Sequence, residues 1–287
     1  MMSRRGALAG LMALSTSACS KLAFVAANVP AAFGAYDRQP DVPYGDGAEH
    51  RLDIYTPTTA ASAPRPVVVF WYGGRWTTGD KADYRFVGAA LAQLGCIAVL
   101  PNYRHYPQVK FAGFMEDAAR AGVWAYEHAA ELGGDRKRFY LMGHSAGAHL
   151  AALTTLDKRY FQATGRPAPA IAGTIGLSGP YDFLPFTDSD IEDMFAPPDR
   201  YAESQPITFA RADAPPMLLI HGLADQTVWP KNSINLAAAL RSRGAAVTLK
   251  LYPKLVHADT VAALSIPARG RAPTLADVAE FIGPVAR

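Results

Sequence analysis

Residues 139–147 have the sequence FYLMGHSAG, an apolar run that leads into the five-residue pattern G-x-S-x-G. In proteins that use this pattern, a sharp turn between a strand and a helix lifts the serine hydroxyl above the end of a sheet. The segment that follows, Ala146 to Leu156, is rich in alanine and leucine and favours a helix. Strand, turn and helix therefore occur in the required order, which predicts Ser145 as a nucleophile. A glycine-rich turn without a catalytic role is the alternative interpretation.

Strand-like and helical segments alternate on both sides of this turn, which is typical of a largely parallel sheet covered by helices on both faces. The predicted strands are His50–Tyr55, Val67–Trp71, Cys96–Leu100, Phe139–Met142, Ile171–Leu177, Met217–Ile220 and Val247–Tyr252. The predicted helices are Tyr84–Leu94, a long helix with an apolar face from Phe114 to Leu132, Ala146–Leu156 and Leu275–Ile282. The first of the strands is expected at an edge of the sheet.

A serine hydroxyl becomes a good nucleophile only when a base removes its proton, and the usual base is a histidine held by a carboxylate. The chain has 7 histidines. His257 directly follows the last predicted strand, where loops of an active site gather. His50, His105 and His128 precede the serine, whereas the order typical of this motif is serine, acid, histidine. We therefore predict His257 as the base.

The predicted acid is Asp225, which ends the segment HGLAD at residues 221–225, directly after the strand Met217–Ile220. This choice gives the order Ser145, Asp225, His257. Asp259 lies only two residues beyond the base, and Asp182 follows a different strand. A helix cap or a turn is the expected role of both.

An oxyanion that forms during ester or amide cleavage needs hydrogen-bond donors. The segment YGGRW at residues 72–76 follows the strand Val67–Trp71 and stands where a glycine-rich oxyanion loop is expected. We predict the backbone N–H groups of Gly74, Arg75 and Ala146 as donors. Ala146 also begins a helix, whose dipole favours a negative charge. A turn without function is the alternative.

Together with Asp53–Tyr55, these pieces resemble the bacterial carboxylesterases related to hormone-sensitive lipase and to the arylformamidases, over residues 42–285. The resemblance implies the α/β-hydrolase fold, with a mostly parallel central sheet and helices on both faces. In that family the oxyanion loop begins with histidine and often contains a third glycine. This chain has Tyr72 and Arg75 at those positions, which leaves the backbone donors but alters the support of the loop.

Composition and motifs exclude several other classes. The 28 Lys and Arg residues are scattered at a net charge of +3, so no basic stripe for nucleic acid is expected. His144 and His149 are five residues apart and do not share a helix face, so no metal site is predicted. Cys19 and Cys96 lie in very different settings, which implies no disulfide framework. The chemistry proposed for the serine needs no cofactor.

The N-terminus has the pattern of an export signal, with Arg4 and Arg5 before an apolar run from Gly6 to Leu14 that is too short to span a bilayer. Residues 16–19, TSAC, resemble a lipobox, in which cleavage leaves a lipid-bearing cysteine, here Cys19. Such boxes usually place leucine three residues before the cysteine, whereas Leu14 is five residues before it.

Two other fates of this segment stay open. Cleavage after Ala27, within a weakly apolar stretch from Leu22 to Ala35, would release a periplasmic or secreted protein. An uncleaved arm on a cytoplasmic enzyme is the third possibility. The predicted organisation is a leader at residues 1–35 and one domain at residues 36–287, with residues 36–48 as the link between them.

A segment rich in proline and aspartate, residues 181–215, follows Ile171–Leu177, the sixth strand of the fold that the resemblance implies. Its length is typical of a functional insertion, here a short cap. Its apolar residues would either line an acyl or alcohol pocket or anchor the insertion to the core. They are Phe183, Leu184, Phe186, Met194, Phe195, Pro197 and Pro198.

These residues predict a serine carboxylesterase that cleaves short-chain acyl esters through an acyl-enzyme. An arylformamidase of the N-formylkynurenine type and a binding protein on an inactive hydrolase fold are the two alternatives. The expected partner is a small-molecule ester, with membrane attachment through Cys19. The sequence gives no indication of the oligomeric state.

Overall fold

Eight strands form one sheet in the computed structural model, which describes residues 22–285. The strands are β1 (Tyr36–Pro43), β2 (Arg51–Pro57), β3 (Arg65–Trp71), β4 (Ile97–Pro101), β5 (Gly134–His144), β6 (Ile171–Leu177), β7 (Met217–Gly222) and β8 (Val247–Tyr252). Their order across the sheet is β1-β2-β4-β3-β5-β6-β7-β8. Only the pairs β1–β2 and β2–β4 are antiparallel. The predicted mostly parallel sheet is confirmed.

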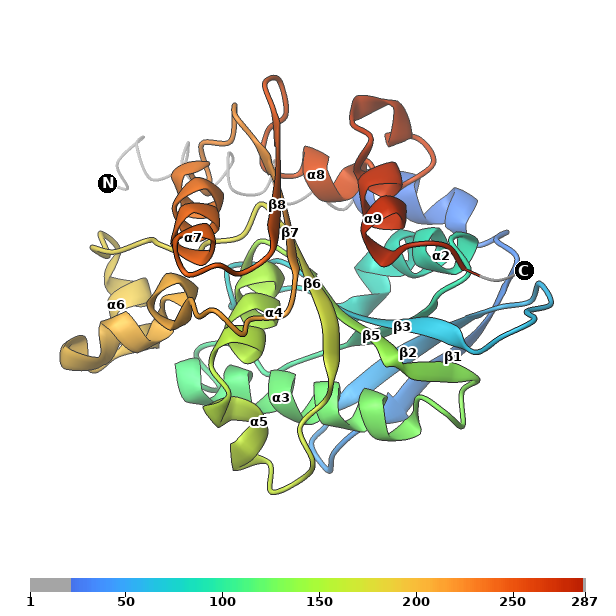
Figure 1. Ribbon diagram of the computed structural model, residues 1–287, viewed down its shortest axis with the longest axis horizontal. Coiled ribbons are helices and arrows are strands. Elements are labelled where there is room, and N and C mark those ends of the chain that lie inside the picture. The colour runs from blue at the N-terminus through green and yellow to red at the C-terminus, as the bar shows by residue number, and fades with distance from the viewer. Residues whose placement is uncertain (1–21, 286–287) are drawn as a thin grey trace, which may run out of the picture.

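Helices cover both faces of this sheet (Figure 1). The α-helices are α2 (Arg85–Gln93), α3 (Phe111–His128), α4 (Ala146–Leu156), α5 (Arg159–Ala163), α6 (Ser189–Phe195), α7 (Lys231–Ser242), α8 (Asp259–Ala262) and α9 (Thr274–Ile282). Short 3-10 helices are η1 (Lys81–Tyr84), η2 (Pro198–Ser204), η3 (Pro206–Phe209) and η4 (Arg269–Arg271). The helices α3, α4 and α7 lie on one side of the sheet, and α2 and α9 lie on the other. This arrangement buries β3 completely, which explains its run of valine and aromatic residues.

The edge of the sheet differs from the prediction. Residues 36–43, which the sequence assigns to a link, form β1, so the predicted edge strand beside it is the second strand. Most side chains of β1 are exposed, and its sequence YDRQPDVP lacks the regular alternation of apolar and polar residues that marks a half-buried strand. Arg38 donates to the fully buried carboxylate of Asp53 at 2.6 Å and fixes β1 to β2.

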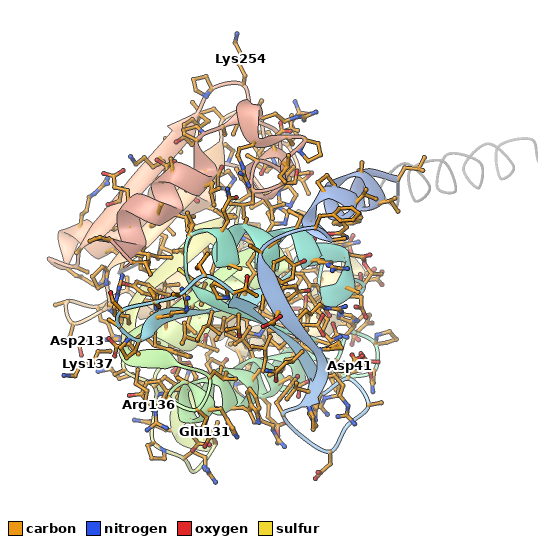
Figure 2. The ribbon with its side chains drawn as sticks, turned by 90° about the vertical axis from the view of Figure 1, so that its right-hand side faces the viewer. Asp41, Glu131, Arg136, Lys137, Asp213 and Lys254 are labelled. Carbon is orange, nitrogen blue, oxygen red and sulfur yellow. The ribbon has the colours of Figure 1, made fainter. Side chains whose placement is uncertain are left out.

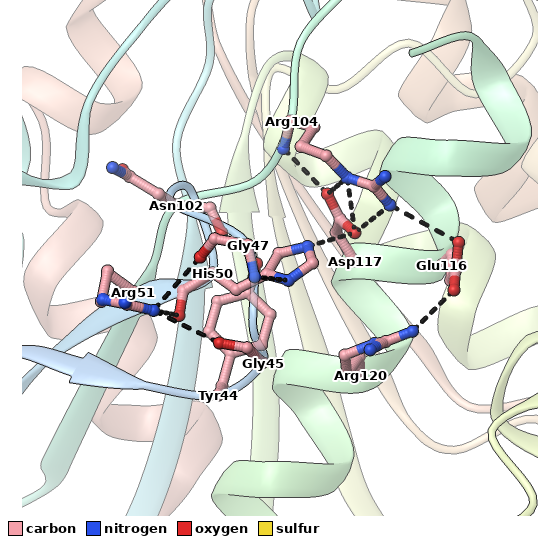
Figure 3. Close-up of polar contacts among 10 residues, drawn as sticks. All are labelled: Tyr44, Gly45, Gly47, His50, Arg51, Asn102, Arg104, Glu116, Asp117 and Arg120. Atoms are coloured by element: carbon pink, nitrogen blue, oxygen red, sulfur yellow. Dashed lines mark hydrogen bonds and ion pairs between the residues drawn. The ribbon is translucent and has the colours of Figure 1, made fainter. Parts of the chain in front are cut away.

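A buried polar network ties this edge to α3 and to the loop after β4 (Figure 3). The carboxylate of Asp117 accepts hydrogen bonds from His50 Nε2 at 2.9 Å, from the backbone N–H of Arg104 at 2.9 Å and from the Arg104 guanidinium at 2.6 Å. A buried carboxylate needs such partners, because it would otherwise lose its hydration without compensation. The network fixes the position of the loop that carries His105.

A helix at residues 22–31 packs on the domain, although the sequence assigns these residues to the leader. Its residue Ala31 is buried in the main core, and Phe24 and Ala27 pack against that core. Arg4, Arg5 and Cys19, on which the export and lipidation predictions rest, lie outside the described residues. The proposed boundary at residue 35 therefore stays a prediction.

Charged side chains of both signs are spread over several parts of the molecule, as Asp41, Glu131, Arg136, Lys137, Asp213 and Lys254 show in Figure 2. This distribution agrees with the scattered charges of the sequence. Within residues 22–285, no helix combines the length and the apolar character needed to cross a bilayer.

Candidate active site

The turn between β5 and α4 holds Ser145 in a strained backbone conformation, with φ of 55° and ψ of −123°. The turn can pack this closely only because the residues two positions before and after Ser145 are glycines. A Cβ atom at Gly143 would lie 2.2 Å from the Gly147 backbone, and one at Gly147 would lie 2.0 Å from the Trp71 carbonyl oxygen. Strain of this kind costs about 1–3 kcal/mol and is found where function requires it. The turn therefore has the geometry of a nucleophile elbow.

A continuous line of hydrogen bonds connects Ser145, His257 and Asp225. His257 Nδ1 lies 2.8 Å from the Asp225 carboxylate, and His257 Nε2 lies 2.8 Å from Ser145 Oγ. Because an ionised carboxylate can only accept, Nδ1 carries the proton and Nε2 is free to accept from the serine hydroxyl. The structure thus brings the three predicted residues together in an arrangement that can deprotonate Ser145.

Asp225 has more partners than the base alone. Its Oδ1 accepts from the backbone N–H groups of Thr227 and Val228, each at 2.9 Å, and its Oδ2 lies 3.2 Å from His221 Nε2. Burial acts to raise the pKa of Asp225, but the hydrogen bonds from His221 and His257 hold that pKa far below its usual value. Asp225 is therefore ionised at neutral pH.

The two rejected acids lie elsewhere, as the sequence predicts. The Asp259 carboxylate accepts from the backbone N–H of Val256 at 2.9 Å and pairs with Arg271. Asp182 accepts from the Asn235 side chain at 2.6 Å. Both carboxylates have local structural partners.

The predicted oxyanion loop lies beside Ser145, and Gly73, which belongs to the predicted loop but was not among its predicted donors, comes close to the serine. A Cβ atom at Gly73 would come 2.8 Å from Ser145 Cβ. Gly74 and Arg75 follow with φ of 148° and 56°. Among the described residues neither N–H group donates to a backbone carbonyl oxygen, as a donor reserved for an anion requires. The assignment of Gly74, Arg75 and Ala146 as donors stays a prediction.

Aromatic packing supports this loop at Tyr72, the position where the carboxylesterases that the chain resembles have a histidine. The Tyr72 ring stacks between Tyr103, at 4.9 Å between centroids, and Tyr84, at 5.7 Å. The Tyr72 hydroxyl lies 3.2 Å from Nε2 of His105, which the Asp117 network holds in place. A Cβ atom at Gly79 would clash with the Tyr72 ring at 2.6 Å. Tyr72 is therefore a tightly packed replacement for the usual histidine.

Two histidines that the sequence analysis did not assign to the site support the predicted base and acid. His144 Nε2 donates to the backbone carbonyl of His257 at 3.1 Å and so restrains the loop that carries the base. His221 Nδ1 lies 2.7 Å from Ser233 Oγ, which orients the ring toward Asp225. His144 belongs to the motif that predicts Ser145, and His221 belongs to the segment that predicts Asp225. Their place in these two motifs was the sequence signal from which a role at the site could have been predicted.

A cavity of about 1180 Å³ opens over Ser145, Ala146 and His257. Its volume is slightly above the range of about 300–1,000 Å³ that is typical of pockets for small molecules. Some apolar residues of the insertion line the cavity and others anchor the insertion to the core, so both predicted roles occur. Phe183 and Leu184 line the cavity, whereas Met194 and Phe195 are buried in the core.

The insertion is fastened rather than loose. The Asn232 side chain accepts from the backbone N–H groups of Tyr181 and Asp182, each at 2.8 Å. The Arg75 guanidinium pairs with Asp188 at 2.6 Å. These contacts join the insertion to α7 and to the oxyanion loop, and the insertion forms one wall of the cavity.

A family model described as BD-FAE matches residues 52–240, which is more than half of the chain. The chain belongs to the BD-FAE family. The matched residues include Ser145 and Asp225 and end before His257.

The BD-FAE chain is also similar to individual esterases and to an amide hydrolase. It is 31% identical over 250 residues to isoprenylcysteine alpha-carbonyl methylesterase of Arabidopsis thaliana, covering 79% of this chain and 57% of that protein. It is 29% identical over 229 residues to kynurenine formamidase of Salmo salar, covering 77% of this chain and 75% of that protein. The chain spans little more than half the length of the methylesterases it matches.

Among solved structures, the BD-FAE chain resembles a thermophilic esterase of Thermogutta terrifontis with propionate bound. The TM-score is 0.72 at 25% identity, over 88% of this chain and 96% of that one. These similarities confirm the predicted resemblance to carboxylesterases and arylformamidases and the α/β-hydrolase fold. They also support the predicted enzyme class, a carboxylesterase-type serine hydrolase.

A buried histidine next to the site gives this BD-FAE protein a predictable pH dependence. His149 on α4 is fully buried and bonds to the Ser204 carbonyl oxygen at 2.7 Å. Burial lowers the pKa of His149 from 6.5 to about 4. Between these values the unfolded chain binds a proton that the folded chain does not, so stability falls as the pH falls, by about 1.4 kcal/mol per pH unit.

We expect His149→Gln to make the free energy of unfolding in urea less dependent on pH between 6.5 and 4. The slope should fall by the amount that corresponds to about one proton bound on unfolding. Glutamine keeps an amide donor for Ser204 but does not titrate. Urea titrations at four or five pH values measure the slope for both proteins. An unchanged slope would contradict this account of His149.

Proposed function

We propose that this chain is a carboxylic ester hydrolase that works through an acyl-enzyme on Ser145. The observation that carries the proposal is the hydrogen-bonded line from Ser145 through His257 to Asp225, with the serine at a strained elbow beneath an open cavity. Esterases among the relatives and structural neighbours support it. The Ser145→Ala experiment in the Discussion tests the proposal.

In the first half of the reaction, Ser145 Oγ attacks the ester carbonyl carbon while its proton moves to His257 Nε2. Asp225 stabilises the imidazolium ion that results. The carbonyl oxygen becomes an oxyanion and accepts from the N–H groups of Ala146, Gly74 and Arg75. When the intermediate collapses, the bond to the alcohol oxygen breaks and His257 returns its proton to that oxygen.

In the second half, water takes the place of the alcohol. His257 removes a proton from the water as the oxygen attacks the acyl carbon of the acyl-enzyme. Collapse of this second intermediate releases the carboxylic acid and restores the Ser145 hydroxyl with the proton from His257. The two halves together consume one ester and one water, and every proton passes through His257.

Cleavage of an aryl formamide is the second candidate. Two observations favour it, namely the similarity to kynurenine formamidase of Salmo salar and the aromatic residues around the cavity. Those residues are Phe24, Trp76, Tyr84, Phe183 and Trp229. A flat aromatic amine would pack well against such walls. The same three residues would perform the reaction, so the substrate alone distinguishes the candidates.

We expect 4-nitrophenyl acetate and butyrate to be cleaved with kcat/KM at least about tenfold above the palmitate ester. The insertion is short and fastened at Asn232 and Arg75, so it does not swing away as a lipase lid would. A long chain would then leave the cavity and gain no binding energy from its outer methylenes.

Values of kcat/KM on acetate, butyrate, palmitate and N-formylkynurenine separate the candidates. The esterase proposal predicts the two short esters at the head of the series. A clear preference for palmitate would show that the insertion opens, and a clear preference for N-formylkynurenine would identify a formamidase. Failure to cleave any of the four would favour a binding protein.

We also propose that the chain is exported and attached to the cell envelope through a lipid on Cys19. The support is the basic and apolar leader before a cysteine in a lipobox-like setting. A single acyl chain gives only marginal membrane binding, and stable attachment needs more than one chain or a second contact.

Cys19→Ala is expected to move the protein from the membrane fraction to the soluble fraction of a bacterial host. Cell fractionation and incorporation of labelled fatty acid measure the two properties. A wild-type protein that never takes up the label would exclude lipidation and leave ordinary secretion or a retained arm.

A further inference from the structure

The helix at residues 22–31 reaches the cavity over Ser145. Phe24, near the N-terminal end of the described part of this helix, lines that cavity together with Tyr84. The two rings lie 5.2 Å apart, and Tyr84 in turn stacks on Tyr72 at the start of the oxyanion loop. A residue from the segment that the sequence assigns to the leader thus forms part of the wall around the candidate active site.

Asn28 fixes this helix by completing the N-terminus of α2. The first N–H groups of a helix have no partner within the helix, and the α2 cap residue Tyr84 provides no side-chain hydrogen bond. Asn28 Oδ1 accepts instead from the backbone N–H of Phe86 at 2.9 Å. Asn28 Nδ2 donates to the backbone carbonyl of Asp83 at 2.9 Å.

A second anchor follows the helix. The Tyr36 hydroxyl donates to the Ala31 carbonyl oxygen at 2.6 Å and accepts from Arg85 Nε at 2.9 Å. The helix is thus tied at two points, and both ties lead to α2. These hydrogen bonds would be lost if residues 22–35 were removed with a leader, so they indicate that this segment stays attached to the domain.

We propose that residues 22–35 belong to the working enzyme, with Phe24 as a specificity-determining wall of the substrate cavity and Asn28 as the residue that positions it. The inference rests on the proposed esterase function. It implies that any cleavage of the leader ends before Leu22, as cleavage before Cys19 would. Cleavage after Ala27 would remove Phe24 and leave Asn28 at a charged, free N-terminus.

The substrate group that meets Phe24 is apolar, because the Phe24 ring offers no hydrogen bond and faces a cavity with other aromatic walls. Either the acyl part or the alcohol part of the ester could be the group that meets Phe24. Two rate ratios detect the contact in either case. The ratio of kcat/KM for 4-nitrophenyl butyrate to acetate reports the acyl arm. The ratio for phenyl acetate to ethyl acetate reports the alcohol arm.

In the full chain, Phe24→Ala is expected to lower one of these ratios by about threefold to tenfold, the effect of losing part of an apolar wall. Asn28→Ala should lower the same ratio by releasing the helix. Phe33→Ala is the matched control, since Phe33 follows the same helix, is 85% exposed and does not line this cavity. It should change neither ratio. Phe24→Leu gives a smaller change in the same direction if the alanine variant folds poorly.

The mature N-terminus provides a readout that does not depend on activity. Intact mass spectrometry of protein purified from the bacterial envelope is expected to find a chain that begins before Leu22. A mature chain that begins after Phe24 would overturn the proposal, as would two unchanged ratios in a folded Phe24→Ala protein. Absence of ester hydrolysis in the parent would instead count against the proposed function, and the N-terminal mass would still decide the fate of the helix.

Discussion

Ser145→Ala is expected to remove nearly all ester hydrolysis, with a loss in kcat of about 10⁴-fold or more. Alanine cannot form the acyl-enzyme, so the only catalysis left is direct attack by water on the ester carbonyl, with the oxyanion loop stabilising the resulting oxyanion. Ser145 Oγ has a single hydrogen-bond partner among the described side chains, His257 Nε2 at 2.8 Å, so the loss of the hydroxyl should disturb little else. Initial rates with 4-nitrophenyl butyrate, before and after the change, measure the effect.

The control for this experiment is the fold of the variant. The backbone N–H of Ser145 donates to the Leu177 carbonyl oxygen at 2.9 Å, and alanine keeps that bond. Circular dichroism and the thermal unfolding midpoint should therefore match those of the parent. A folded variant that retains more than about a tenth of the parent rate would show that another residue is the nucleophile.

Asp225→Asn is expected to lower kcat by about 10³ to 10⁴-fold, the second large effect. An asparagine can present its amide N–H to His257 Nδ1, which favours the tautomer with the proton on Nε2. That tautomer cannot accept the Ser145 proton. The missing negative charge also leaves the imidazolium ion unsupported.

Asp259→Asn is the matched comparison, because it makes the same change in the loop that carries the base. Asp259 bonds to the Val256 backbone and pairs with Arg271, and it makes no hydrogen bond to His257 among the described contacts. We expect its kcat to stay within a few-fold of the parent. If the two losses were reversed in size, Asp259 would be the acid and the hydrogen-bond line described above would not be the catalytic one.

Local patterns were sufficient to predict seven of the eight strands of the sheet. The strands β6 and β8 and the helix α4 have the bounds that the sequence predicts, because apolar runs of these lengths are limited by turn residues on both sides. The elbow was predictable for a related reason. Only glycine allows the close approach at Gly143 and Gly147. The two glycines of the motif therefore follow directly from the lack of space at the turn.

Elements whose role depends on distant partners were not predictable in this way. Tyr36 and Val42 are the two residues of the strand β1 that pack against the core, and the buried partner of Arg38 lies on another strand. The helix at residues 22–31 resembles a second apolar stretch of a leader, because its contact with Tyr84 and Phe86 cannot be seen in the local sequence. The closeness of Gly73 to Ser145 was not predictable for the same reason, since their distance is set by β3 and β5 lying side by side.

Covalent labelling of the nucleophile tests the central claim most directly. Paraoxon transfers a diethylphosphoryl group to an activated serine, and peptide mass spectrometry of the inactivated protein locates that group. The account predicts one label per chain, on the peptide that contains Ser145, with loss of ester hydrolysis in proportion to labelling and no label in Ser145→Ala. Inactivation accompanied by a label on any other residue, with Ser145 unmodified, would contradict it.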